Sequence, residues 1–200
     1  EKATLDRIPI PDFDALTPHQ RTEIVHLFER LRTGQASWED VDAWVAQLYG
    51  LGARDLQVIA DTLMFNLPFS QNKHHAQQLP TPQDKARFCS VLAEELAPWC
   101  QRFGTRLTVA PMPQLVGSPW AGIALRTADT LHAISLNDWD GLLRAADETA
   151  STEVLVRLDG AGMLLGRLAQ QRYWSDTQAR LLAQHIVWAH LDVLKGSALA

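Results

Sequence analysis

Short strand-like segments between longer helical ones set the fold class of this 200-residue chain. The segments rich in Val, Ile, Leu and Thr, as β-strands usually are, lie at 105–110, 120–127, 130–136, 152–158 and 162–169. The Asp-Gly-Ala-Gly sequence at 159–162 favours a hairpin turn. Helical patterns occur at 81–103, 138–148 and 175–194. The chain is therefore expected to be α+β, with an antiparallel sheet flanked by helices.

The first third of the chain carries helix signals. Thr17 and Pro18 supply an N-cap and a proline at the first helical position. Ser37 marks the start of a second helix, and a third is expected over 55–67. The apolar positions of the first two helices are expected to pack together in a compact three-helix region. They are Ile24, Val25, Leu27, Phe28 and Leu31, then Val41, Trp44, Val45 and Leu48.

The expected domain boundary lies between these helices and the sheet. Residues 1–67 are interpreted as an extended, proline-containing segment followed by the helical region. Residues 68–80 are polar, bounded by prolines and without periodicity, which is typical of a linker or a long surface loop. Residues 81–200 are then predicted to form a separate α+β accessory domain.

Common catalytic motifs are missing from the sequence. It has no Gly-x-Ser-x-Gly nucleophile turn, no phosphate-binding Gly-x-x-x-x-Gly-Lys and no zinc-binding His-Glu-x-x-His. The Asn-Leu-Pro-Phe sequence at 66–69 is similar to the base-binding tetrapeptide of amino-group DNA methyltransferases. However, Leu67 stands where those enzymes have proline, and a helical pattern precedes it. We therefore expect no active site and no cofactor in this chain.

Histidine positions do not favour a metal site. His74 and His75 lie in the polar stretch, and no cysteine or acidic residue has a spacing that suggests a shared ligand set. His185 and His190 are five residues apart, and this spacing does not bring two side chains to one face of a helix. His74 and His75 are expected to be ordinary solvated histidines, and no metal site is expected at either pair.

Polar and aromatic residues are densest between the last predicted strand and the last predicted helix. This cluster comprises Arg167, Gln170, Arg172, Tyr173, Trp174 and Arg180. Arginine and aromatic side chains contact phosphates and bases in nucleic-acid-binding proteins, and they are equally frequent at protein interfaces. The cluster is thus a candidate surface for DNA or for a protein partner. Alternatively, Tyr173 and Trp174 pack beneath the final helix and the arginines are solvated.

Charge and cysteine content limit the partners and the compartment. The net charge of −5 means that DNA would have to be met by a local basic patch. No apolar run reaches the roughly 18 residues of a membrane span, so no membrane partner is expected. Cys89 and Cys100 are separated by roughly 16 Å of helix, too far for a mutual disulfide. Reduced thiols favour a cytoplasmic location.

Two short motifs in residues 5–65 carry a family resemblance. The first is Ile8-Pro9-Ile10-Pro11 followed by Leu16–Arg21, which is similar to the Ile-Pro-x-Pro…Gln motif near the end of target-recognition domains. The second is Leu48-Tyr49-Gly50-Leu51, which resembles part of a helix pair after such domains, with Asp42 before it and Asp55, Val58-Ile59 and Thr62-Leu63 after it. In this order the motifs resemble the C-terminal region of bacterial DNA adenine methyltransferases of restriction–modification or phage-defence systems.

The resemblance implies a parent enzyme that uses S-adenosylmethionine to methylate adenine in DNA. The catalytic tetrapeptide and the cofactor loop of that family have no matching positions here. The chain is therefore expected to be a non-catalytic C-terminal piece that assists recognition of target duplex DNA. The alternative is a protein-interaction module that docks another subunit of a defence complex.

Overall fold

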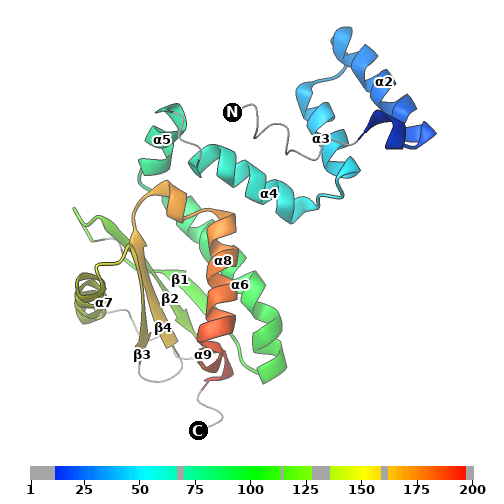
Figure 1. The fold of residues 1–200 in the computed structure, drawn as a ribbon. Helices are drawn as coiled ribbons and strands as arrows, with labels where there is room; N and C mark the ends of the chain where they lie inside the picture. Colours follow the sequence, from blue (N-terminus) through cyan, green and yellow to red (C-terminus); the bar gives the residue numbers. More distant parts are fainter. Residues whose placement is uncertain (1–11, 67–69, 114, 128–135, 159–161, 197–200) are drawn as a thin grey trace. The chain divides into compact units, whose positions relative to one another are not determined.

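The structure, a computed structural model, divides into two compact units, Glu1–Leu56 and Gln57–Ala200 (Figure 1). The residues that it describes are 12–66, 70–113, 115–127, 136–158 and 162–196. The division falls earlier than the boundary expected at 68–80. The α+β prediction is confirmed, because helices precede a four-stranded antiparallel sheet.

Unit 1 contains a short 3₁₀ helix, η1 (Phe13–Ala15), and two longer helices, α2 (Pro18–Arg32) and α3 (Trp38–Leu48) (Figure 1). Thr17 caps α2 as predicted: its hydroxyl accepts from the Gln20 amide, and the Gln20 side chain accepts from the Thr17 amide. The Ser37 amide likewise donates to the Asp40 carboxylate at the start of α3. Local capping chemistry therefore fixes where both helices begin.

The third predicted helix, expected over 55–67, begins two residues earlier, and its last turn is π-helical. Helix α4 spans Ala53–Asp61, and one π-helical turn, η2 (Thr62–Asn66), follows it. The prediction of a linker or loop at 68–80 is wrong, because helix α5 (Ser70–Gln77) lies in this segment. Its stability comes from tertiary contacts that periodicity does not reveal. Ala76 is buried, and the His75 ring stacks on Phe65 with centroids 5.6 Å apart.

Helix α6 (Pro82–Phe103) is the long helix that the sequence predicts. The Thr81 hydroxyl caps it, and Gly104 ends it in the left-handed conformation with φ of 67°. One face of α6 is fully buried and carries Phe88, Leu92 and Leu96. This face forms one wall of the larger hydrophobic core.

The sheet has the strand order β1-β2-β4-β3, with every neighbouring pair antiparallel. The strands are β1 (Thr108–Pro111), β2 (Trp120–Arg126), β3 (Glu153–Leu158) and β4 (Gly162–Leu168). Four of the predicted strand segments are thus confirmed. Most of the fifth, 130–136, lies outside the described residues, and Leu136 begins helix α7 (Leu136–Thr149).

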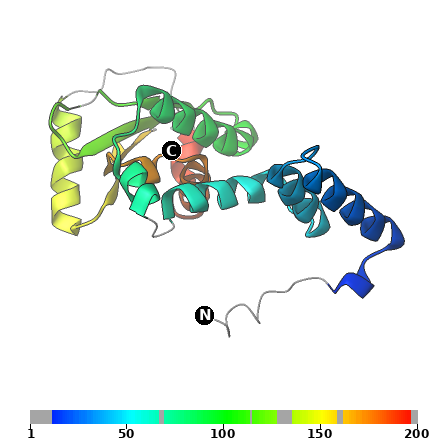
Figure 2. The ribbon, with the colours of Figure 1, turned by 90° about the horizontal axis from the view of Figure 1, so that it is seen from above.

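Helices cover both faces of this sheet (Figures 1 and 2). Helices α6, α8 (Asp176–Ala189) and α9 (Leu191–Lys195) pack on one face and enclose the larger core. Helix α7 packs on the other, where Trp139 and Leu142 meet Leu164. Gly122 and Gly166 make this close packing possible. A Cβ at Gly122 would lie 2.6 Å from the Met112 sulfur, and one at Gly166 would collide with Leu142.

Candidate functional site

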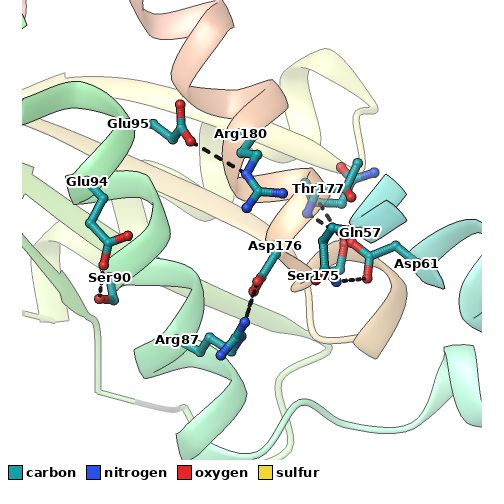
Figure 3. Close-up of polar contacts among 11 residues, drawn as sticks. Gln57, Asp61, Arg87, Ser90, Glu94, Glu95, Ser175, Asp176, Thr177 and Arg180 are labelled. Carbon is teal, nitrogen blue, oxygen red and sulfur yellow. Dashed lines mark hydrogen bonds and ion pairs between the residues drawn. The ribbon is translucent and has the colours of Figure 1, made fainter. Parts of the chain in front are cut away.

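A polar network surrounds the first turn of α8 in unit 2 (Figure 3). Ser175 is the N-cap, and its hydroxyl accepts from the Gln178 amide. The Asp61 carboxylate, from the end of α4, accepts from the Thr177 amide at 2.9 Å and from the Gln57 side chain at 2.9 Å. A carboxylate at a helix N-terminus is stabilised by the free amide donors and the helix dipole. These bonds therefore hold Gln57 and Asp61 of α4 against α8.

Arg87 of α6 closes the same network (Figure 3). Its Nε and Nη2 atoms donate to the two carboxylate oxygens of Asp176 at 2.8 and 2.6 Å, the bidentate geometry that arginine favours. Asp176 is buried, whereas Arg87 is largely exposed. The hydrogen bonds with Asp176 raise the pKa of Arg87. The carboxylates of Asp61 and Asp176 already accept bonds within the fold, so the network is suited to structure rather than to proton transfer.

Arg167, the first residue of the sequence-predicted cluster, is an internal residue. Its side chain is 4% exposed and forms an ion pair with Glu153, while Nη1 donates to the Tyr173 carbonyl oxygen at 2.9 Å. The guanidinium carbon also lies 5.4 Å from the centre of the Phe88 ring. Burial lowers the pKa of Arg167. Arg167 thus joins β4 to β3 and to the segment before α8, and it does not offer its charge to DNA at the surface.

Trp174 lies in the interior of unit 2, whereas Arg180 is half-buried. Trp174 is 3% exposed, its indole nitrogen donates to the Leu168 carbonyl oxygen at 3.1 Å, and its ring packs against Phe88. Arg180 lies 3.5 Å from the Glu95 carboxylate on α6 (Figure 3). Its Nη1 atom is buried without a hydrogen-bond partner in the described part of the chain. The alternative in which Tyr173 and Trp174 pack in the interior agrees with the buried Trp174 and with Tyr173, which is half-buried against the larger core. Arg167, however, is buried and not solvated.

The remaining members of the cluster lie nearer the surface than Arg167 and Trp174. Gln170, Arg172 and Tyr173 are half-buried at or beside the 3₁₀ helix η3 (Gln171–Tyr173). The Arg172 guanidinium stands 5.8 Å from the centre of the Tyr173 ring, at the distance of a cation–π contact. The structure therefore brings the six residues near one another but divides them into a buried set and a surface set.

Large apolar side chains in unit 1 form an unexpected exposed surface. Val25 is 55% exposed, Phe28 61% and Trp38 70%, although the sequence predicted packed faces for the first two. That prediction is wrong at Val25, Phe28 and Val45. Among the described residues 12–56, only Leu16, Leu27 and Ala46 are buried. A helical wheel could have revealed this, because Val25 and Phe28 lie away from the Leu27 side of α2.

The two helices of unit 1 face each other across a polar groove of about 440 Å³. Apart from Leu27 and Trp44, the side chains in it are mainly polar or charged, among them His19, Glu23, His26, Arg30, Asp40 and Gln47. The His19 Nδ1 atom lies 3.2 Å from Glu23 on the same helix. Val25, Phe28 and Trp38 are not among the residues that line this groove.

Two histidines of unit 2 depart from expectation. The rings of His185 and His190 stack with centroids 5.6 Å apart, although their spacing excludes one face of a continuous helix. The reason is that α8 ends at Ala189, and His190 has the non-helical φ of −137°. Among the described residues, no three or more His, Cys, Asp or Glu side chains are grouped closely enough to hold a metal ion.

The cysteines are free and buried in α6. Burial raises the pKa of the Cys89 thiol to about 12, and it also raises the pKa of Cys100. The thiolate is the nucleophilic form, so both side chains are poor nucleophiles. Their role is packing in the larger core.

Within the described ranges, no helix is both long and apolar enough to cross a membrane. Unit 2 is thus a helix-covered sheet with an internal polar network, and unit 1 is a helical unit with exposed apolar side chains.

Comparisons of the chain with protein-family models, with curated proteins and with solved structures found no significant match.

Proposed function

We propose that this chain is a non-catalytic protein-interaction module of a DNA-modification or phage-defence system, with its docking surface on unit 1. The exposure of Phe28 and Trp38 carries the proposal. Single exposed apolar residues are ordinary, but here they accompany a unit that buries only three residues in its described part. Most helix stability in proteins comes from packing of an apolar face, so a partner surface would stabilise α2 and α3.

The biological setting comes from the resemblance to DNA adenine methyltransferases. In that setting S-adenosylmethionine belongs to the catalytic part of the parent protein, and no cofactor is proposed for this chain. The proposed compartment is the cytoplasm, on the basis of the free thiols of Cys89 and Cys100.

Site-specific crosslinking tests the interaction role. A photo-crosslinking amino acid replaces Phe28 of the chain in its natural host, and adducts are identified by mass spectrometry. Trp188, which is 93% exposed in unit 2, is the control position. We expect a protein adduct from position 28 that position 188 does not give, with a DNA-modification subunit or another copy of this chain as the captured protein. Equal, unspecific labelling from both positions would overturn the docking surface.

DNA recognition is the second candidate function. Gln170, Arg172 and Tyr173 support it, because they combine a guanidinium with an aromatic ring near the surface of unit 2. Binding to a fluorescent duplex is measured at about 50 and 200 mM salt, since phosphate contacts weaken steeply over that range. A DNA role requires that the chain binds the duplex at the lower salt concentration and that Arg172→Ala weakens this binding. An interaction role alone predicts no binding at either salt concentration.

A further inference from the structure

We infer that the partner that covers α2 and α3 is a second copy of this chain, packed so that α2 of each copy lies against α3 of the other. The inference rests on the proposed interaction role and specifies its occupant. It rests on two outward-facing rows of side chains, one on each helix. Each row has two apolar side chains and one charged side chain, and the two charges are opposite.

The first row, the α2 outer stripe, consists of Val25, Phe28 and Arg32. Their spacing of three and four residues places them on one side of the helix, away from the polar groove. All three are exposed. Arg32 pairs with Glu29 of its own helix at 2.8 Å, but both partners are more than half exposed. Such a surface pair contributes little free energy, so Arg32 can exchange it for a carboxylate on another chain.

The second row, the α3 outer stripe, consists of Trp38, Asp42 and Val45. These residues are separated by four and three positions and are also exposed on the side away from the groove. The stripe has the same pattern as the first, two apolar side chains and one charge, with the sign reversed. Among the described residues of unit 1, Trp38 is the most exposed large apolar residue, at 70%.

Charge favours the α2–α3 pairing over the alternatives. Helix α3 contains Glu39, Asp40 and Asp42 and no basic residue, whereas α2 contains Arg21, Arg30 and Arg32 against two glutamates. Packing α3 on α3 of another copy would bring like charges together. Packing α2 on α3 brings opposite charges together, and a two-fold axis makes that favourable contact twice.

The available apolar area suits a small, specific dimer. A buried aromatic side chain covers roughly 150–250 Å². At their exposed fractions, Phe28 and Trp38 of two copies would together remove roughly 500 Å² from water. The smallest stable interfaces bury about 1,200 Å² in total. Val25, Val45 and the aliphatic parts of neighbouring polar side chains can supply the rest.

Sedimentation equilibrium of the whole chain over a range of concentrations tests the inference. We expect a reversible monomer–dimer equilibrium. Phe28→Glu and Trp38→Glu should each weaken the dimer by roughly thirtyfold or more, as loss of an interface hot spot does. Trp188→Glu, at a tryptophan of unit 2 that is even more exposed than Trp38, should leave the dimer unchanged. Circular dichroism of every variant confirms that the helices are retained.

Charge exchange provides a test that does not depend on the apolar residues. Arg32→Glu and Asp42→Arg should each weaken the dimer, and the chain carrying both changes should associate more strongly than either single variant. A double variant no stronger than the singles would overturn the α2–α3 pairing. A wild-type chain that remains monomeric would overturn the second copy as occupant. It would leave the proposed interaction role intact if position 28 still crosslinks to a different protein.

Discussion

Arg167 shows at the scale of one residue why the most conspicuous sequence cluster is divided. Its guanidinium is held by Glu153 and by the Tyr173 carbonyl oxygen inside unit 2. We expect Arg167→Ala to lower the free energy of unfolding by about 2–4 kcal/mol, because it removes a buried, hydrogen-bonded charge and its packing. Urea denaturation measures the change. Arg172→Ala, at a half-buried residue of the same cluster, should cost less than about 1 kcal/mol. Equal losses would show that Arg167 has no special structural role.

His190 gives the molecule a pH dependence at the residue scale. Burial, Arg157 and His185 lower its pKa, against a smaller opposing effect of Asp192. The unfolded chain therefore binds protons more readily at this side chain than the folded one does. His190 therefore contributes to the free energy of unfolding. This contribution is complete above the ordinary histidine pKa of about 6.5 and is lost as the pH falls through the lowered pKa of the folded state. We expect the urea concentration at half unfolding to decrease when the pH is lowered from 7.5 to 5, and to decrease less in His190→Asn. If His190→Asn keeps the pH dependence of the wild type, His190 is not the source of that dependence.

At the scale of elements, sequence signals located most helices because the signals are local. Thr17, Ser37, Thr81 and Ser175 each precede a helix in the structure. Helix α5 escaped prediction because its stability depends on contacts distant in sequence, such as the Gln171 amide donating to the Gln78 carbonyl oxygen. The same limit applies to the candidate site. Composition grouped Arg167 with Arg172, but only strand pairing shows that Arg167 lies opposite Glu153.

The contact between α7 and the sheet depends on a missing side chain at Gly166. A Cβ there would collide with Leu142, which is completely buried. We expect Gly166→Ala to lower stability by about 1–3 kcal/mol through overpacking. Gly141, within α7, is the matched control because nothing lies within 4 Å of a Cβ at that position. Gly141→Ala should raise stability by about 0.5–1 kcal/mol, since alanine is the better helix former. Thermal unfolding of both variants checks the two opposite signs, and a tolerated Gly166→Ala would mean that α7 moves away at little cost.

At the scale of the whole molecule, the two units differ in how much core they contain. Unit 2 buries large side chains on both faces of its sheet, whereas the described part of unit 1 buries only Leu16, Leu27 and Ala46. A unit with so little buried apolar surface opens locally at low free-energy cost, and its amides exchange with solvent accordingly. We expect amides of α2 and α3 to exchange far faster than those of β2 and β4 in dilute protein, as followed by hydrogen–deuterium exchange and mass spectrometry.

The concentration dependence of that exchange separates weak local structure from an uncovered docking surface. If a second copy covers the outer stripes, raising the protein concentration should slow exchange in α2 and α3, because association stabilises the covered state by mass action. Exchange in β2 and β4 should not change, which serves as the internal control. The Phe28→Glu variant should lose the effect while keeping the fast exchange of dilute protein. Slow exchange in α2 and α3 of the monomeric Phe28→Glu variant would mean that unit 1 is stable by itself, and its exposed apolar residues would then no longer require a partner.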